Sequence, residues 1–230
     1  YWIKLKKISQ KSKKQRDKRL VIAACIMVAV CFLAAVKLLS GAVDQYYEQR
    51  MTVCLDAGHG GSDSGATSTD GKRKEKDDNL ALTLKVRDNL EAMGVEVILT
   101  REDDIFVELK QRCKIANKSR CALFVSIHRN SSATGTGFEA WVSKIPKGKE
   151  EKTAKKIIEK LSDVGGENRG VKRGYRSSTA NNYYVNANTN MPSILLEVGF
   201  VTNEEDNKNF DKSIDEYAKI IAEEIYSEVS

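Results

Sequence analysis

The ten residues from Cys121 to Asn130 read CALFVSIHRN, and the first seven are nearly all apolar. An apolar run of this length, without alternating polar residues, is typical of a strand covered on both faces of a parallel sheet. Shorter runs of the same character occur at Thr52–Asp56 (TVCLD) and Ser193–Val198 (SILLEV). Segments with helical spacing of apolar residues lie between them. The sequence therefore predicts an α/β fold, a twisted, mostly parallel sheet with helices on both faces.

The other predicted elements continue this alternation of strands and helices. The first helix of the folded part is expected to be capped by Asp78 or Asn79 and to stop at Gly94. Residues 163–181 are polar and contain glycine, so they are expected to form a loop. The apolar spacing predicts further helices over 106–116, 154–161 and 214–229, and further strands over 95–100, 137–143 (an edge position being one option) and 183–186.

The N-terminal part differs in composition from the rest of the 230-residue chain. Residues 1–19 contain nine lysines and arginines and precede an apolar stretch, 20–39, that is interrupted only at Lys37. About 20 apolar residues suffice for a transmembrane helix, and a basic flank stays on the cytoplasmic side. We therefore expect a basic cytoplasmic segment at 1–19, a transmembrane signal-anchor at 20–39, a connector at 40–50 and one folded domain at 51–230. Cleavage as a signal peptide after the small residues 40–42 is the open alternative, and it would release a secreted domain.

The formal net charge of +6 comes from this basic segment, because the remaining basic and acidic residues nearly balance. Membrane topology explains a basic segment beside an apolar span, so no nucleic-acid partner is predicted. The five cysteines show no CxxC spacing, and those of the folded domain lie among aliphatic residues. They are interpreted as small buried apolar groups and not as metal ligands or disulfide partners.

The chain contains only two histidines, and both follow predicted strands. His59 comes after TVCLDAG, and His128 comes directly after ALFVSI. Ligands gather beyond the carboxyl ends of strands in parallel sheets, so both imidazoles are expected at the same rim. A catalytic zinc needs about three protein ligands, and with no third histidine a carboxylate completes the set. Glu75, on the loop that also carries His59, is the best candidate, and Asp63 is a competing one.

Glu197 interrupts the otherwise apolar strand SILLEVGF. Burial of a carboxylate costs several kcal/mol unless the group is paired, hydrogen-bonded or close to a metal. At the end of a strand it could reach a water molecule in a metal site. A structural buried ion pair is the alternative interpretation.

Eight segments in order resemble one known family, the zinc-dependent N-acetylmuramoyl-L-alanine amidases. They are DAGHGGSDSGA, EKDDNLAL, LTREDD, ELKQRCKIAN, LFVSIHRN, GFEAW, NRGVK and MPSILLEVGFVTN, and the resemblance extends over essentially all of residues 51–230. The resemblance implies that His59, Glu75 and His128 bind zinc and that Glu197 is the catalytic acid–base group. It favours Glu75 over Asp63 as the third ligand. Ala57 and Arg129 depart from the family pattern without removing a ligand.

The implied reaction is hydrolysis of the amide bond between N-acetylmuramic acid and L-alanine in peptidoglycan, by a zinc-activated water with Glu197 as base and then acid. Asp56 and Asn130 are expected to orient the ligands through hydrogen bonds. A single catalytic domain behind an N-terminal anchor is similar to amidases that remodel the spore cortex. Two other functions stay open at this point: a zinc-containing wall-binding module without catalysis, and a zinc peptidase. The sequence identifies no protein activator.

Overall fold

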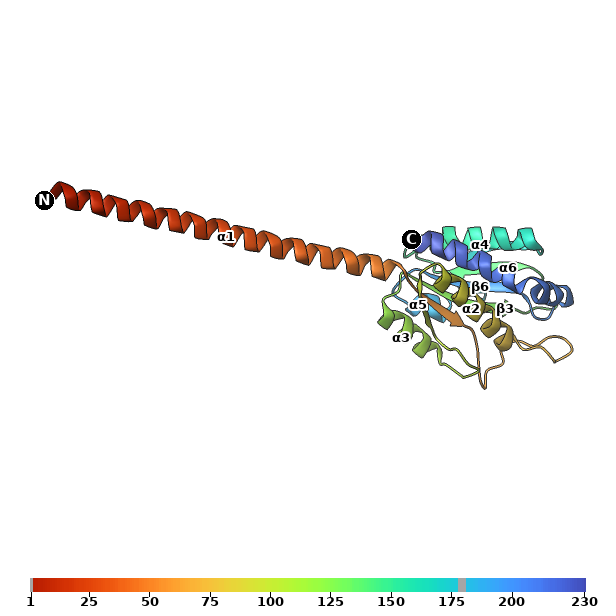
Figure 1. Cartoon of the computed structure of the whole chain (residues 1–230). Coiled ribbons are helices and arrows are strands. Elements are labelled where there is room, and N and C mark those ends of the chain that lie inside the picture. The colour runs from red at the N-terminus through yellow and green to blue at the C-terminus, as the bar shows by residue number, and fades with distance from the viewer. Residues whose placement is uncertain (1, 178–180) are drawn as a thin grey trace. The chain divides into compact units, whose positions relative to one another are not determined.

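The computed structural model describes residues 2–177 and 181–230, and the chain divides into two compact units, Tyr1–Tyr47 and Glu48–Ser230 (Figure 1). A single helix, α1 (Trp2–Arg50), runs through the first unit. The segment 40–50, expected to be a connector, is therefore helical. It contains no proline, and its single glycine is insufficient to stop the helix.

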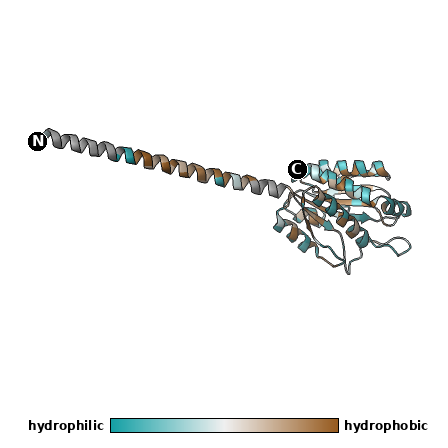
Figure 2. Ribbon diagram, viewed as in Figure 1, coloured by the Kyte–Doolittle hydropathy of each residue, from teal (hydrophilic) through white to brown (hydrophobic). Residues whose placement is uncertain are grey.

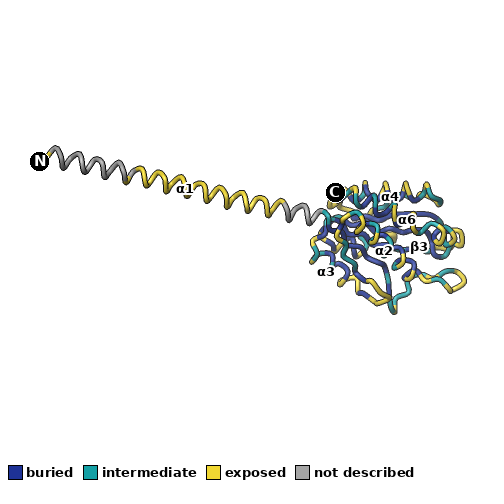
Figure 3. The backbone as a smooth tube through the Cα atoms, viewed as in Figure 1, coloured by how far each residue is buried: buried dark blue, intermediate teal, exposed yellow. Residues whose placement is uncertain are grey.

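The apolar part of α1 spans Lys18–Val43, 26 residues. Its most apolar 18-residue window has a mean hydropathy of 2.7, and none of that window is buried. Figure 2 shows this stretch as the long apolar section of α1, and Figure 3 shows it as exposed. At 1.5 Å per residue it is about 39 Å long, which exceeds the ~30 Å hydrocarbon thickness of a bilayer. An exposed helix of this kind is a candidate membrane span.

The second unit is built on one six-stranded sheet with the order β2-β1-β3-β6-β4-β5. All neighbouring strands are parallel except β4 and β6, which are antiparallel. The predicted, mostly parallel sheet is thereby confirmed. The strands are β1 (Thr52–Ala57), β2 (Glu96–Leu99), β3 (Leu123–Asn130), β4 (Phe138–Val142), β5 (Asn168–Arg173) and β6 (Ser193–Phe200).

Helices cover both faces of this sheet, as predicted. One face packs against α2 (Glu75–Ala92), α4 (Glu150–Val164) and α6 (Glu204–Val229), and the other against α3 (Leu109–Ser119) and α5 (Tyr184–Asn188). The three cysteines of the second unit are buried, in agreement with their interpretation as apolar packing groups: Cys54, Cys113 and Cys121.

Several predicted boundaries are wrong. Residues 163–181 were expected to be a loop, but β5 lies within them and forms the sheet edge, so β4 is internal. Residues 183–186 were expected to be a strand, but they belong to α5 and the residue before it. The helix α2 begins at Glu75, three residues earlier than its expected cap, with Lys74 at the N-cap position. Three acidic residues in its first turn interact favourably with the helix dipole and support this early start.

Candidate metal centre and catalytic site

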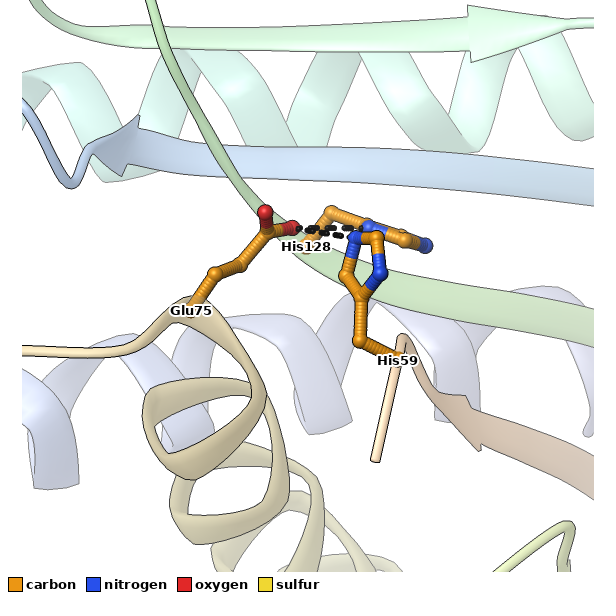
Figure 4. Close-up of side chains that lie close together, drawn as sticks. All are labelled: His59, Glu75 and His128. Carbon is orange, nitrogen blue, oxygen red and sulfur yellow. Dashed lines mark hydrogen bonds and ion pairs between the residues drawn. The ribbon is translucent and has the colours of Figure 1, made fainter. Parts of the chain in front are cut away.

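His59, Glu75 and His128 meet at one rim of the sheet (Figure 4). His59 lies just after β1, Glu75 is the first residue of α2, and His128 lies two residues before the end of β3. Glu75 Oε1 is 2.9 Å from His128 Nδ1 and 3.2 Å from His59 Nε2. One potential ligand atom from each residue lies within 4.8 Å of the other two. The sheet thus brings together the three ligands expected from the sequence.

Glu75 is held in place through both oxygens of its carboxylate. The main-chain N–H of Ala66 donates to Oε2 at 2.9 Å, and that of Arg129 donates to Oε1 at 3.2 Å. Burial opposes ionisation of this carboxyl, but the hydrogen bonds and positive charge of His128 and His59 outweigh it and lower its pKa. The group is therefore ionised and preorganised, as a metal-binding carboxylate must be.

His59 is oriented by Asp63. Its Nδ1 lies 2.8 Å from Asp63 Oδ2, which directs Nε2 toward Glu75. Burial alone lowers the pKa of His59, but the Glu75 and Asp63 carboxylates outweigh this effect and raise it to about 9. The structure therefore separates the two candidate third ligands: Glu75 faces both histidines, while Asp63 contacts the far nitrogen of one.

The backbone at His59 has φ of 61°, a left-handed conformation that is uncommon for a residue with a Cβ. Two buried arginines hold this turn. Arg112 donates to the carbonyls of His59 at 2.6 Å and Ala57 at 2.6 Å, and Arg101 donates to those of Ala57 at 2.9 Å and Gly58 at 3.0 Å. Fixed guanidinium geometry suits several carbonyls at once, and lysine would not replace it. The surrounding structure thus stabilises a strained conformation that places the imidazole.

Gly58 provides the space for His128. A Cβ added at Gly58 would lie 2.2 to 2.6 Å from three atoms of the His128 ring. Gly65 is similarly close to the site: a Cβ there would lie 2.6 Å from His59 Cδ2 and 2.7 Å from Glu75 Oε2, and its φ is +62°. The GHGGSDSGA segment therefore packs its backbone directly against the three side chains.

Glu197 lies on the adjacent strand, level with His128. The two residues are register partners of β3 and β6, so their side chains leave the same face of the sheet. Glu197 is 6 % exposed, and its Oε2 has no hydrogen-bond partner among the described residues. Burial, together with the charge of Glu75, raises the pKa of Glu197 to about 8. It lines a cavity of about 220 Å³ together with the three candidate ligands.

The expected orienting role of Asp56 and Asn130 is wrong as a direct hydrogen bond. Asp56 instead accepts from Thr100, Ser126 and Arg112, so it positions the arginine that holds the His59 turn. Asn130 accepts through Oδ1 from Arg176 and from the Ser131 main chain. Asp56 therefore supports His59 through Arg112, whereas Asn130 holds Arg176, which lies beside Glu197.

Sequence reasoning missed Glu139, Arg169 and Lys172. Glu139 is buried on β4, directly opposite Glu197, and accepts from Lys172 Nζ at 2.6 Å and Arg169 Nε at 3.0 Å. The signal was present, since Glu139 interrupts an apolar strand (FEAWV) as Glu197 does.

The donor set of the site fits a zinc ion. Two imidazole nitrogens and one carboxylate oxygen are a known ligand combination of catalytic zinc. Glu75 lies between two histidines, and the nearby Glu197 Oε2 lacks a partner, so a cation at this position would be balanced by carboxylates. Zinc coordination by these residues agrees with their chemistry.

A family model described as N-acetylmuramoyl-L-alanine amidase matches residues 53–230. The germination-specific N-acetylmuramoyl-L-alanine amidase of Bacillus subtilis is 34% identical over 169 residues, 66% of this chain and 67% of that protein. The first curated relatives are matched over 32% to 72% of their own length, so several of them extend well beyond the shared part.

Two solved structures share the fold at substantial identity. The catalytic domain of CwlV, an N-acetylmuramoyl-L-alanine amidase from Bacillus (Paenibacillus) polymyxa var. colistinus, has a TM-score of 0.68 and 37% identity, covering 78% of this chain and 99% of that one. The CwlD amidase from Clostridioides difficile, in complex with the GerS lipoprotein, has a TM-score of 0.65 and 36% identity, covering 76% and 94%. The chain belongs to the N-acetylmuramoyl-L-alanine amidase family.

Proposed function

We propose that this protein is a zinc-dependent hydrolase that cleaves the amide bond between N-acetylmuramic acid and L-alanine in peptidoglycan. The observation that carries the proposal is the meeting of His59, Glu75 and His128 within 4.8 Å, with Glu197 beside them in one cavity. Membership of the N-acetylmuramoyl-L-alanine amidase family indicates which bond is cleaved and that the substrate is peptidoglycan. The buried Glu197 speaks against a wall-binding module without catalysis. Its Oε2 has no hydrogen-bond partner among the described residues, and its Oε1 lies 3.7 Å from the Arg176 guanidinium, so its burial is only partly compensated.

A zinc ion held by these three side chains would supply Lewis-acid polarisation of the scissile carbonyl. Glu197 accepts the proton of the attacking water and returns it to the departing amine, so one carboxyl acts first as base and then as acid. A cation close to Glu197 favours the ionised carboxylate that the first step requires. Asp63 fixes the tautomer of His59, and Arg112 fixes its backbone.

The reaction is tested by mass spectrometry of digested peptidoglycan. The native protein is expected to release intact stem peptides that begin with L-alanine, to lose activity in a chelator and to regain it on addition of zinc. Spore-cortex and vegetative peptidoglycan are tested separately, since the relatives include germination-specific and sporulation-specific amidases. Cleavage within the stem peptide would instead indicate a peptidase.

We further propose that α1 anchors the protein in the cell membrane, with residues 1–19 cytoplasmic and residues 51–230 as an extracytoplasmic catalytic domain. The exposed apolar stretch Lys18–Val43 and its basic N-terminal flank support this topology. The untreated protein should then be found in the membrane fraction. Protease added to spheroplasts should degrade its catalytic domain. Recovery of the domain in the medium would indicate cleavage, and protection from protease would contradict the topology.

A further inference from the structure

The groove at the sheet rim has two arms of different chemistry on either side of Glu197. The central cavity shares His59, His128 and Tyr175 with a neighbouring cavity of about 550 Å³, and it shares Asn130 and Arg176 with another of about 270 Å³. The three cavities therefore form one continuous groove. It crosses the sheet from β1, past β3 and β6, to β4 and β5.

The smaller arm is basic. Its lining carries three cations, Arg169, Lys172 and Arg176, against the single carboxylate of Glu139. Glu139 is buried and accepts hydrogen bonds from both Lys172 and Arg169. It therefore holds both cationic groups in place, but its single negative charge balances only one of them. Arg169 also contacts Glu167, at 3.4 Å, on its exposed side. Arg176 lies 3.7 Å from Glu197 Oε1 and donates to Asn130, both on the side of the central cavity. Lys172 and Arg176 nevertheless keep 36% and 47% of their side-chain surface exposed, so both heads remain accessible to an anion.

The larger arm is apolar and aromatic. Three of its lining residues are exposed apolar or aromatic side chains: Phe106 (53%), Leu109 (53%) and Tyr184 (43%). Its one arginine, Arg112, is buried and already donates to main-chain carbonyls and to Asp56. Asp63 adds a negative charge at this end. Apart from His59, which belongs to the candidate metal centre, the described lining residues of this arm therefore offer no accessible cation.

We infer that the groove binds its substrate in one direction, with the carboxylates of the stem peptide on Lys172 and Arg176 and the glycan in the aromatic arm. This inference rests on the proposed function, because the amidase reaction places peptide and glycan on opposite sides of the scissile bond. The stem peptide is the part that carries carboxylates, and only the basic arm can pair with them. Sugar rings have apolar faces and neutral hydroxyls, which suit an aromatic wall. Lys172 and Arg176 are thus specificity-determining residues.

The test measures binding of two synthetic stem peptides by calorimetry, one with free carboxyl groups and one with every carboxyl amidated. Neither contains muramic acid, so neither is cleaved. The native protein should bind the acidic peptide about tenfold more tightly than the amidated one, as one charge-assisted hydrogen bond predicts. Lys172→Gln should abolish most of this preference while Arg169 still pairs with Glu139. Arg176→Gln, at the more exposed position, provides a second variant should Lys172→Gln fail to fold.

The matched control is Lys155→Gln, an exposed lysine of α4 outside the groove, which should retain the native preference. Equal affinity of the native protein for both peptides, no measurable binding of either, or an unchanged preference in both groove variants would overturn the inference. Cleavage of peptidoglycan by the native protein is measured in parallel. If the native protein does not cleave peptidoglycan, the proposed function is wrong. If it cleaves peptidoglycan but shows no preference for the acidic peptide, only the direction of binding is wrong.

Discussion

Substitution of Gly58 by alanine is expected to weaken zinc binding strongly without unfolding the protein. Gly58 is not among the residues with a positive φ, so alanine can adopt its backbone conformation. The carbonyl of Gly58, which accepts from Asn79 and Arg101, is unaffected by a change of side chain. The added methyl group therefore acts almost entirely on its neighbour, His128.

The size of this effect follows from the distances at the site. The new Cβ would lie 2.2 Å from His128 Cε1, whereas ordinary van der Waals contact begins at 3.4 Å. The ring must therefore move by about 1 Å, several times the ~0.2 Å tolerance of a zinc–ligand distance. Because β3 is buried and paired on both sides, the movement falls on the His128 side chain. We expect zinc affinity to fall by at least about 100-fold.

Zinc affinity is measured by competition with a chromophoric chelator, and stability of the metal-free protein by urea denaturation. Gly71→Ala is the matched control. Gly71 lies in the same loop and has a φ of +73°, but a Cβ there meets nothing within 4 Å. It should lose some stability and keep its zinc. Native zinc affinity in Gly58→Ala would refute the assignment of His128 as a ligand, and equal loss in both variants would point to general disturbance of the loop.

Three other substitutions and one pH series follow from the site. Glu197→Gln should keep its zinc and lose about 10²- to 10⁴-fold in turnover, and a native rate on purified peptidoglycan would rule out the acid–base role. His128→Ala should lower the zinc content measured by atomic absorption, and unchanged zinc would contradict the ligand assignment. Arg112→Lys should lower the free energy of unfolding by about 2 kcal/mol or more, since several buried hydrogen bonds are lost, and an unchanged urea midpoint would contradict its supporting role. His59 has a pKa raised from 6.5 to about 9, so its stabilising effect on the metal-free protein is complete below pH 6.5 and is lost as the pH rises through 9. Zinc affinity should increase over the same interval because zinc displaces that proton, and pH-independent affinity between pH 6 and 9 would contradict this.

The central strands and the site residues could be predicted because they carry strong local signals. The segments that form β3 and β6 are apolar on both faces, and each ends beside a charged or titratable residue that has no place in an apolar core. Parallel strands align their carboxyl ends, so His128 and Glu197 were expected at one rim, and they are register partners. The fold class and the meeting of His59, His128 and Glu197 follow from this alignment, whereas Glu75 was preferred to Asp63 because of the family resemblance.

The elements that were missed form only through contacts with other parts of the chain. The sequence of β5 is NRGVKR, which lacks an apolar face, and it becomes a strand because it pairs with β4. Likewise, nothing in the sequence of β4 indicates that it runs antiparallel to β6. The short α5 begins at a tyrosine-rich segment whose local preference is for a strand. It is helical because it packs against α3, and this contact outweighs the local preference. The supporting roles of Arg112 and Arg101 depend on carbonyls more than 40 residues away.

The charged edge strand β5 has a second consequence, for the solution behaviour of the protein. An unpaired strand edge is a template for association with other chains, and positive charge on it discourages such contacts. Arg169, Lys172 and Arg173 provide that charge here. Variants that neutralise this strand therefore weaken a safeguard against aggregation, and their monodispersity should be established by light scattering before their binding is compared.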